Sequence, residues 1–423
     1  MKTKCPPVKS LTPPNDLRMT WLVERLDRRA EGVAVSDGAR ALAPMTLPGE
    51  VIDGDAVDGR ITQPRIVTPS PNRVRAPCPH YRVCGGCALM HADDGFVADW
   101  KAGLVQSALA RQGVVAEIGG HHTSPPRSRR RAVLSVRRTK KGALAGCHAR
   151  ASDVVVDISE CLVVTPAILS SLPALRQMAQ FGGSRSGELS VAVTDTGSGL
   201  DVAVQGGKPI GAALIGRLAE LAGQQDWARV TWGDQSLTLH APILTIGPAS
   251  VTPPPGSFLQ ATQDGERALV QAVTTALDGC DRVADLFAGI GTFALPLSTH
   301  SDVHAVEGLS APLSALDAAW RRTPGLHRVT TETRDLARRP LLPDELSRFD
   351  GVVIDPPRAG AESQARALAQ SSIGVIAWVS CDPVTFARDA KIMQDGGYQI
   401  GAVELIDQFR WSSHVETFTV FRK

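Results

Sequence analysis

Three groups of chemically capable residues in the C-terminal part of the chain each follow a short apolar run. They are DLFAGIG at 285–291, DPPR at 355–358 and SCDP at 380–383. Because the carboxyl ends of parallel strands meet at one edge of a sheet, we expect the three groups to lie together. A glycine-rich turn, two carboxylates and a thiol would then share one site, an arrangement typical of ligand binding and catalysis.

The glycine-rich turn is expected to bind a nucleoside. Gly289 and Gly291 permit a sharp turn and a close approach of the ligand to the backbone. The third glycine of the dinucleotide fingerprint is absent, which argues against NAD. Glu307 follows Asp285 by 22 residues, at the end of the next predicted strand. A carboxylate there can accept hydrogen bonds from both ribose hydroxyls, so adenosine is the predicted ligand class.

The thiol of Cys381 lies in a predicted strand-to-helix turn, where the amides of the helix terminus would lower its pKa. Asp355 follows a predicted strand and precedes two prolines, so it can orient the polar groups of a ligand. Glu416 begins the last predicted strand, residues 416–421, whose alternation predicts a place at or near an edge of the sheet.

A cluster of thiols lies in the segment CPHYRVCGGC at 78–87. Its cysteines are Cys78, Cys84 and Cys87. Soft thiolates favour zinc or an iron–sulfur cluster, and both take four ligands. His80 or His91 could complete a zinc site, whereas Cys161 or Cys147 could complete an all-thiolate set.

A basic segment follows the cysteine cluster. Residues 121–150 contain nine Lys or Arg and no Asp or Glu. Alternation over 129–137 predicts strands with one positively charged face, which would meet phosphates. The arginines expected on that face are Arg129, Arg130, Arg131 and Arg137. Residues 1–250 carry 29 basic against 22 acidic side chains and residues 251–423 carry 16 against 21, so a polyanion is expected to bind the first part.

The 423 residues are too many for one ordinary domain, and their patterns divide into three parts. Short strands separated by Gly, Pro and Asp predict a small antiparallel barrel in the domain at 16–75. The Pro- and Arg-rich stretch at 62–77 is predicted to be the linker to the next domain. Mixed signals at 76–250 predict an α+β domain, and alternating β and α signals at 251–423 predict a doubly wound, Rossmann-like α/β domain. Without an apolar run of membrane-spanning length or a signal-peptide pattern, the protein is expected to be cytoplasmic.

These motifs resemble those of the RNA 5-methyluridine methyltransferases, which are class I enzymes dependent on S-adenosylmethionine. The resemblance rests on DLFAGIGTF at 285–293, DPPRAG at 355–360, SCDP at 380–383 and HVE at 414–416. It implies that the C-terminal part is the methyltransferase domain.

Two further features resemble one branch of that family. The spacing C-x5-C-x2-C with a distant fourth cysteine is similar to the branch that binds a [4Fe-4S] cluster, and this resemblance assigns the fourth ligand to Cys161. The predicted barrel, with EGVA at 31–34 and LPGE at 47–50, is similar to a TRAM domain, an oligonucleotide-binding barrel.

By position, the resemblance implies that Cys381 is the nucleophile and Glu416 the general base, and that Phe258 contacts RNA. The cofactor contacts that it implies are Gln260, Phe287, Gly289, Glu307, Asp335 and Asp355. The implied substrate is a uridine of ribosomal large-subunit (23S) RNA, with the T-loop uridine of transfer RNA left open. The protein is expected to act as a monomer.

The implied chemistry explains why a thiol is needed. Carbon 5 of uridine is too weak a nucleophile to accept a methyl group unaided, and addition of the Cys381 thiolate to carbon 6 gives carbon 5 carbanion character. After methylation, Glu416 would remove the proton left on carbon 5 so that the thiolate can leave. The target base must be splayed from its stack.

Three alternatives stay open. An RNA cytosine-5 methyltransferase shares the addition step, but usually has a second cysteine where this chain has DPPR at 355–358. A non-catalytic iron–sulfur protein that binds RNA would have the same fold without turnover. Zinc instead of iron could occupy the cysteine cluster.

Overall fold

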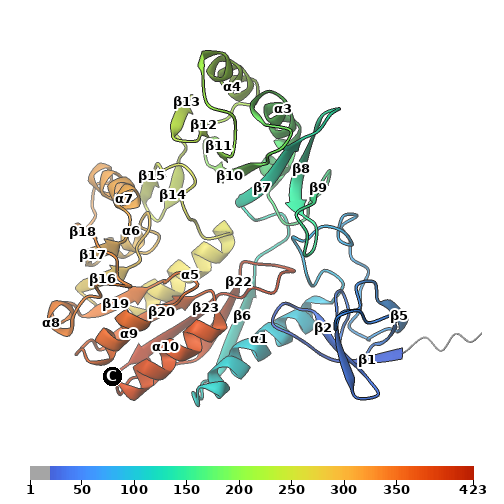
Figure 1. Cartoon of the computed structure of the whole chain (residues 1–423). Helices are drawn as coiled ribbons and strands as arrows, with labels where there is room; N and C mark the ends of the chain where they lie inside the picture. The colour runs from blue at the N-terminus through green and yellow to red at the C-terminus, as the bar shows by residue number, and fades with distance from the viewer. Residues whose placement is uncertain (1–19) are drawn as a thin grey trace, which may run out of the picture. The chain divides into compact units, whose positions relative to one another are not determined.

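The computed structural model describes residues 20–423, which separate into two compact units between Val74 and Arg75 (Figure 1). Residues 16–19 of the expected barrel lie outside the described residues. Among residues 20–423, every helix is too short or too polar to cross a membrane.

The first unit is a five-stranded antiparallel sheet. Its strands are β1 (Thr20–Leu26), β2 (Gly32–Ser36), β3 (Ala39–Ala43), β4 (Val51–Asp53) and β5 (Arg65–Thr68), in the order β3-β2-β1-β4-β5. Alternating side chains build a small core around Trp21 and Ile52. The backbone of Leu42 in β3 also bonds Gly59 and Ile61, so β3 is partnered on its outer side.

Strand β5 lies inside the segment 62–77 that was expected to be a linker. It follows Pro64, precedes Pro69 and is the last strand of its sheet. Because the outer N–H groups of an edge strand need no partner, prolines are tolerated there, and their presence hid this strand.

The second unit contains a seven-stranded sheet, which we call the central sheet. Its strands are β7 (Arg131–Arg138), β8 (Ala143–His148), β9 (Val155–Asp157), β10 (Leu189–Thr196), β11 (Gly199–Gln205), β12 (Arg229–Trp232) and β13 (Gln235–Thr238), in the order β13-β12-β11-β10-β7-β8-β9. Helices α2 (Pro166–Ser170), α3 (Leu172–Gly182) and α4 (Ala212–Gln224) pack on one face. Residues of β7 alternate between this face and the opposite, partly exposed one, which carries Val133. The small hairpin β14 (Leu244–Ile246) and β15 (Ala249–Val251) follows.

The second sheet of this unit, the catalytic sheet, has nine strands. They are β6 (Ile118–Thr123), β16 (Arg282–Leu286), β17 (Asp302–Glu307), β18 (Val329–Thr333), β19 (Gly351–Ile354), β20 (Val375–Ser380), β21 (Gln399–Ile400), β22 (Val403–Asp407) and β23 (Thr417–Arg422). The order is β18-β17-β16-β19-β20-β23-β22-β6, with β21 paired to β23. Strands β16 to β20 are parallel, and their order reverses between β16 and β19, where open α/β sheets bind ligands.

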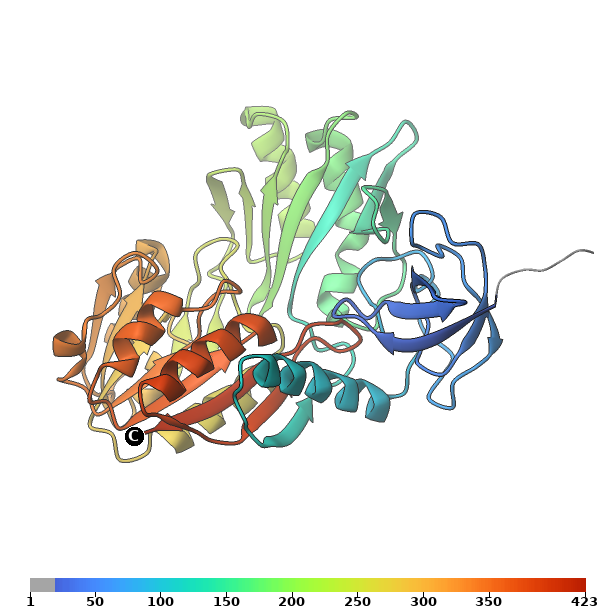
Figure 2. The same ribbon diagram turned by 60° about the horizontal axis from the view of Figure 1, so that its bottom comes forward.

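Helices cover both faces of the catalytic sheet, as the alternating pattern predicted (Figure 2). They are α1 (Asp94–Arg111), α5 (Gln263–Ala276), α6 (Ala294–Leu297), α7 (Ser310–Arg322), α8 (Pro343–Leu346), α9 (Glu362–Ala369) and α10 (Pro383–Asp395). Helices α5, α6 and α7 share one buried core with the sheet, and α1, α9 and α10 share the other.

The position of the last strand differs from the prediction. We expected residues 416–421 at or near an edge, but β23 lies between β20 and β22. Strand β6 from residues 118–123 pairs in parallel with β22 and forms the edge beyond it. The alternation in β23 therefore reflects the two different helix layers on its faces, not exposure to solvent.

Candidate active site

The carboxyl end of β16 carries the glycine-rich turn. Phe287, Gly289 and Gly291 all have positive φ, at 64°, 54° and 95°, which folds the chain sharply back. A side chain added at Gly289 would meet nothing within 4 Å, so this part of the turn is open to a ligand.

Asp285 immediately precedes this turn and is completely buried. Neither of its carboxylate oxygens has a side-chain partner among residues 20–423. Burial, together with the charges of Asp355 and Glu307, raises its pKa to about 8. A buried carboxylate without a counter-ion is costly, so this position suits a cationic ligand.

Glu307 and Asp335 lie at the next two strand ends. The carboxylate of Glu307 accepts the amides of Gly289 and Leu309, each at 3.1 Å, which fixes it beside the turn. The carbonyl of Glu307 accepts the amide of Arg334 at 2.8 Å, and Asp335 follows directly. The two carboxylates thus line the same edge as Asp285.

A chain of two glutamines holds Asp355 at the end of β19. Gln260 Nε2 donates to Asp355 Oδ2 at 2.9 Å, and Gln260 Oε1 accepts from Gln408 Nε2 at 2.7 Å. Burial raises the pKa of Asp355 to about 7, although the Gln260 amide favours the charged form. Both glutamines are buried, so the network fixes the orientation of this carboxylate.

Cys381 and Glu416 lie side by side at the ends of β20 and β23. Ser380 pairs with Thr417 across these strands, and Thr417 Oγ1 donates to the Ser380 carbonyl at 3.0 Å. In an antiparallel pair, the residues just beyond that partnership, Cys381 and Glu416, are therefore opposite each other. Burial raises the pKa of Glu416 well above its ordinary value, the charge of Asp355 adds to this, and Arg358 opposes it.

The expected lowering of the Cys381 pKa is wrong for the ligand-free protein. Burial and the negative charges of Glu416 and Asp355 raise it to about 12, whereas the cation of Arg358 opposes the rise. The turn before α10 was expected to supply stabilising amides, but Asp382 occupies the helix N-cap and accepts the amides of Val384 and Thr385. Carboxylates from other strands therefore outweigh the local helix terminus.

This pKa predicts a steep pH dependence of thiol reactivity. Below a pKa of about 12 the thiolate fraction of Cys381 rises tenfold per pH unit, so alkylation by iodoacetamide should increase without a plateau from pH 7 to pH 10. Pulsed labelling with mass spectrometry of the Cys381 peptide measures the rate. The Glu416→Gln variant, which lacks one of the opposing charges, should be labelled faster at the same pH. A plateau near pH 8.5 would contradict the raised pKa.

Residues 408–416 connect β22 to β23 beside these carboxylates. His414 Nε2 lies 3.2 Å from Arg358, and the His414 and Phe409 rings meet edge to face, with centroids 5.8 Å apart. The guanidinium of Arg129 lies 5.7 Å from the centre of the Phe409 ring. Phe258, at 75% exposure, is the most exposed phenylalanine described and comes two residues before Gln260. Aromatic and cationic groups therefore surround the site.

The cysteine cluster lines a separate cavity of about 170 Å³. Its thiols are Cys78, Cys84, Cys87, Cys147 and Cys161. Burial and the neighbouring thiols raise the pKa of Cys87 to about 12, and Cys147 forms a hydrogen bond with Cys84. His80 also lines the cavity, whereas His91 is buried against the Tyr81 hydroxyl at 2.6 Å. Among residues 20–423, no three such side chains enclose the position of a single metal ion.

The four arginines expected on one basic face do not share it. Arg131 and Arg137 lie on the same face of β7 as Val133, and Arg129 lines the cysteine cavity. Arg130 is buried at 8% exposure, forms an ion pair with Glu266 and donates to the carbonyl of Gln260. The expectation that Arg130 meets phosphates is wrong for this conformation, because its guanidinium is already neutralised.

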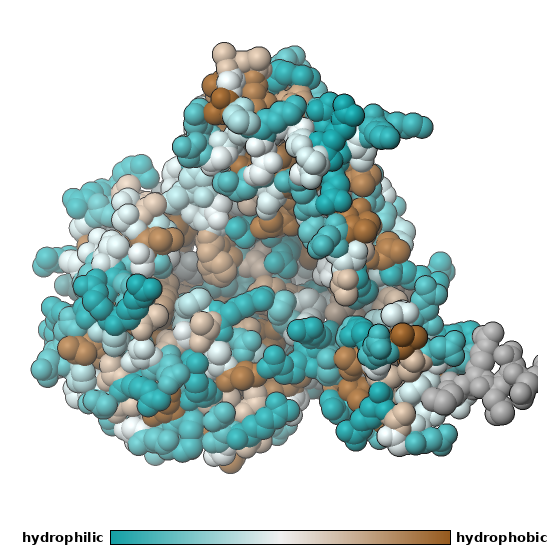
Figure 3. Space-filling model, in the orientation of Figure 1, coloured by the Kyte–Doolittle hydropathy of each residue, from teal (hydrophilic) through white to brown (hydrophobic). Residues whose placement is uncertain are grey.

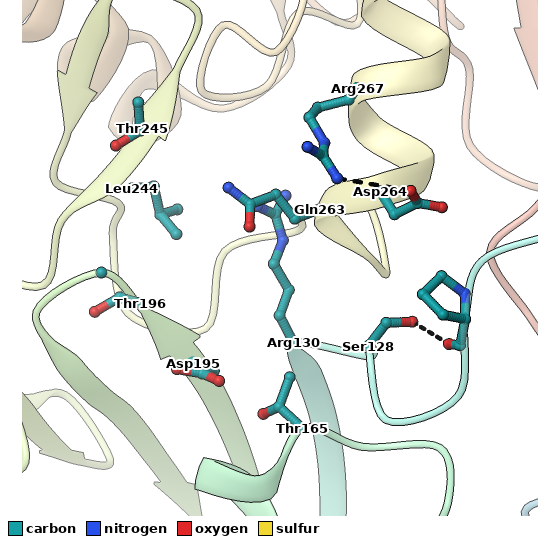
Figure 4. A pocket seen from close by; sticks show the side chains of 12 residues that line it. Ser128, Arg130, Thr165, Asp195, Thr196, Leu244, Thr245, Gln263, Asp264 and Arg267 are labelled. Atoms are coloured by element: carbon teal, nitrogen blue, oxygen red, sulfur yellow. Dashed lines mark hydrogen bonds and ion pairs between the residues drawn. The ribbon is translucent and has the colours of Figure 1, made fainter.

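Arg130 lines a cavity of about 400 Å³ (Figure 4). Polar residues from the central sheet and from the start of α5 line this cavity, among them Asp195, Asp264 and Arg267. It contains none of the three strand-end groups, and its acids and bases balance. This cavity is therefore a polar junction between the central sheet and α5 rather than the active site.

Comparison with known proteins identifies the family. The chain is 42% identical to an uncharacterized RNA methyltransferase of Mesorhizobium japonicum over 404 residues, which covers 95% of this chain and 98% of that protein. It is 32% identical to the Chromohalobacter salexigens protein named 23S rRNA (uracil(1939)-C(5))-methyltransferase RlmD, with coverage of 95% and 88%. Residues 326–423 match the family described as tRNA (Uracil-5-)-methyltransferase. The chain belongs to the RNA uracil-5-methyltransferase family.

A solved structure matches this RNA methyltransferase along most of its length. It is the Pyrococcus abyssi tRNA (uracil-54, C5)-methyltransferase in complex with S-adenosyl-L-homocysteine, with a TM-score of 0.75. The match covers 95% of this chain and 99% of that one at 20% sequence identity, and it bears out the mixed α/β methyltransferase fold.

Three residues of the methyltransferase that contribute to this site were not assigned from sequence. Asp285 was noted only as the start of a motif, yet it is a buried carboxylate without a counter-ion. Gln408 and His414 join the site through contacts with Gln260 and Arg358. No local sequence pattern identifies Gln408 as a site residue. Asp285 could have been identified, because an aspartate at the end of an apolar run predicts a buried carboxylate.

Proposed function

We propose that this enzyme transfers a methyl group from S-adenosylmethionine to carbon 5 of a uridine in 23S rRNA through a covalent bond between Cys381 and carbon 6. The observation that carries the proposal is the pairing of Ser380 with Thr417, which sets Cys381 opposite Glu416 at the edge that holds Asp355. The name of the relative RlmD favours ribosomal RNA over transfer RNA.

The ligand-free edge fits S-adenosylmethionine. Glu307 would hold the ribose hydroxyls, Gly289 leaves room for the ligand and Asp285 offers a carboxyl group without a counter-ion to the amino-acid ammonium. Phe287, Gln260, Asp335 and Asp355 complete the proposed contacts. The cofactor supplies an electrophilic methyl group on a sulfonium sulfur. Its positive charge offsets the cluster of carboxylates at this edge.

Asp285→Asn tests that fit. The variant keeps the shape of the side chain but cannot ionise to pair with the ammonium, so we expect S-adenosylmethionine to bind about 10- to 100-fold more weakly, the range of one charged hydrogen bond. Isothermal titration with S-adenosylmethionine and with adenosine separates the contribution of the ammonium. Adenosine should bind both proteins equally, and equal weakening of both ligands would contradict the assignment.

The residues of the chain perform the remaining chemistry. The Cys381 thiol gives up its proton to solvent and its sulfur adds to carbon 6 of the uracil, which raises the nucleophilicity of carbon 5. Carbon 5 then takes the methyl group, and the electron pair of the broken bond stays on the sulfur of S-adenosylhomocysteine, which leaves. Once carbon 5 carries the methyl group, Glu416 accepts its proton, the ring regains aromaticity and the thiolate leaves. Arg358 and Gln260 hold Glu416 and Asp355 through charge and hydrogen bonding.

We further propose that the cysteine site holds a [4Fe-4S] cluster on Cys78, Cys84, Cys87 and Cys161. Five thiols around about 170 Å³ support a group larger than one ion, since a single water occupies about 30 Å³. Several thiolates crowded around one cavity would repel one another, and a cationic iron core would offset that repulsion. Equal amounts of iron and acid-labile sulfide in anaerobically purified protein are expected, and zinc without sulfide would overturn this assignment.

We propose that RNA contacts β7 and, separately, the first unit, which we propose to be a TRAM-like barrel. The hairpin that joins β7 to β8, with Arg138, Lys140 and Lys141, is hydrophilic (Figure 3). Arg129, which lies over the Phe409 ring, and the exposed Phe258 would contact the target region.

Charge reversal on β7 tests the proposed RNA contact. Arg131→Glu with Arg137→Glu should weaken RNA binding about 100-fold at low salt and lower the slope of log K against log salt by about two. Filter binding over a salt series measures both. Arg328→Glu is the matched control. Arg328 is exposed and precedes β18, the edge strand of the catalytic sheet at the opposite side from β6. Equal affinity of the two variants for RNA would show that β7 does not contact RNA.

Methyl transfer to unmodified RNA tests the function as a whole. With tritiated S-adenosylmethionine, we expect incorporation into 23S rRNA transcripts, located as 5-methyluridine by nuclease digestion and mass spectrometry. Incorporation into transfer RNA alone would identify the substrate as the T-loop uridine of transfer RNA. Incorporation as 5-methylcytidine, or none into either RNA, would overturn the proposal.

A further inference from the structure

Residues 408–416, which we call the substrate loop, must be held in place by something other than their own conformation. The loop carries Phe409 and His414 and ends at Glu416. Trp411 within it has φ of +61°, a left-handed backbone conformation that is strained in a residue with a side chain. Such a conformation persists only where surrounding contacts determine it.

The contacts that determine it come from the segment after the cysteine cluster. The carbonyl oxygen of Trp411 accepts two amides, from Ala88 at 2.7 Å and from Leu89 at 2.9 Å. Leu89 is completely buried. These two residues directly follow Cys87, so the last thiol of the cluster motif is one peptide bond away from the first of the two donors.

The cysteine segment itself is tied to these donors. The hydroxyl of Tyr81, between Cys78 and Cys84, donates to the carbonyl of Ala88 at 2.7 Å. The amide of Gly85 bonds the carbonyl of His148 in β8 at 2.9 Å. The order of residues 88 and 89 therefore depends on the order of the cysteine segment.

A second connection joins the cavity to the substrate loop. Arg129 lines the cysteine cavity and its guanidinium lies over the ring of Phe409. Lys101 of α1, in the stretch that follows the cysteines, pairs with Asp407 at 2.6 Å and donates to the carbonyl of Phe409 at 3.2 Å. These contacts anchor the start of the loop. The middle of the loop is held by the hydrogen bonds to the Trp411 carbonyl, which come from the residues next to Cys87.

We propose that Ala88 and Leu89 are positioning residues for catalysis: filling the cysteine site orders their amides, which hold the Trp411 carbonyl and so place His414 and Glu416 beside the target base. The inference rests on the proposed metal occupancy of the cysteine site. It gives that site a role in a reaction that transfers no electrons.

Hydrogen exchange of the full chain tests the coupling. Anaerobically purified protein is compared with protein stripped of iron by a chelator and oxidant, and exchange is followed by mass spectrometry. Peptides that contain residues 88–89 and 408–414 should lose protection together, by about tenfold or more, whereas peptides of β16 and α7 and the affinity for S-adenosylmethionine stay unchanged. Unchanged protection of 408–414 after iron removal would overturn the proposal.

A pair of variants at one position tests the contact itself, whatever occupies the cysteine site. Ala88→Pro removes one of the two amide donors, and Ala88→Gly retains it. We expect Ala88→Pro to raise exchange at 408–414 about tenfold and to lower kcat about tenfold with unchanged cofactor affinity, and Ala88→Gly to resemble the parent. If both variants behave alike, the contact is not a positioning device.

Iron content, measured on every sample, separates this inference from the proposed function. A parent protein without iron would remove the cluster but leave the variant comparison decisive for the contact. Should Ala88→Pro fail to fold, as judged by loss of protection in β16 and α7, the exchange comparison of loaded and stripped parent protein decides alone.

Discussion

Cys381→Ala should lower kcat by about 10⁴-fold or more while S-adenosylmethionine still binds. Without the sulfur no covalent bond to carbon 6 can form, and carbon 5 stays too weak a nucleophile to accept a methyl group. The thiol lies among carboxylates at the ends of β20 and β23, away from the glycine-rich turn, so the cofactor contacts at Asp285 and Glu307 should persist. Single-turnover methyl transfer and equilibrium dialysis measure the two quantities.

Cys280→Ala provides the matched control. Cys280 is buried, but it precedes β16 and so lies at the amino ends of the parallel strands, opposite the ends that carry Cys381. Its replacement should leave turnover within about twofold of the parent protein. Retention of more than 1% of activity in Cys381→Ala would disprove the nucleophile assignment.

Glu416→Gln should accumulate a covalent complex between protein and methylated RNA. The variant keeps Cys381 and can still form the bond to carbon 6, but an amide cannot take the proton from carbon 5, so release of the thiolate slows by about 10²- to 10⁴-fold. Loss of the Glu416 charge also lowers the pKa of Cys381, which favours the initial addition. A band of retarded mobility in denaturing gels, which requires both RNA and S-adenosylmethionine, reports the complex.

Glu404→Gln on β22, the strand next to β23, is the control for this substitution. It should release free methylated RNA at the normal rate. Normal product release by Glu416→Gln would transfer the role of base to another group, with Asp355 the nearest carboxylate in the site.

The strand-end motifs could be predicted because their information is local. Apolar runs such as Val352–Ile354, followed at once by polar residues, mark buried parallel strands and their carboxyl ends. The same reasoning placed Glu307 at the end of the strand next to β16. The topology then brings these ends together without further information.

Other features depend on contacts between distant residues. The pKa of Cys381 is raised by burial and by Glu416 and Asp355 on other strands, so its own strand-to-helix turn predicted the wrong direction of the shift. Arg130 belongs to an alternating run typical of a surface strand, but in the folded chain its guanidinium forms an ion pair with Glu266 of α5. Gln408 has no recognisable pattern because its partner is 148 residues away.

The route of the chain through the catalytic sheet also bears on how the protein is synthesised. Strand β6 pairs with β22, so residues 118–123 can complete the edge of the sheet only after residues 403–407 have been synthesised. During translation this long-range pairing can form only when almost the whole polypeptide has left the ribosome, a topology associated with slow folding. A truncated version starting at residue 251 would leave β22 with an unpaired, aggregation-prone border. Expression of the catalytic part therefore has to begin upstream of α1.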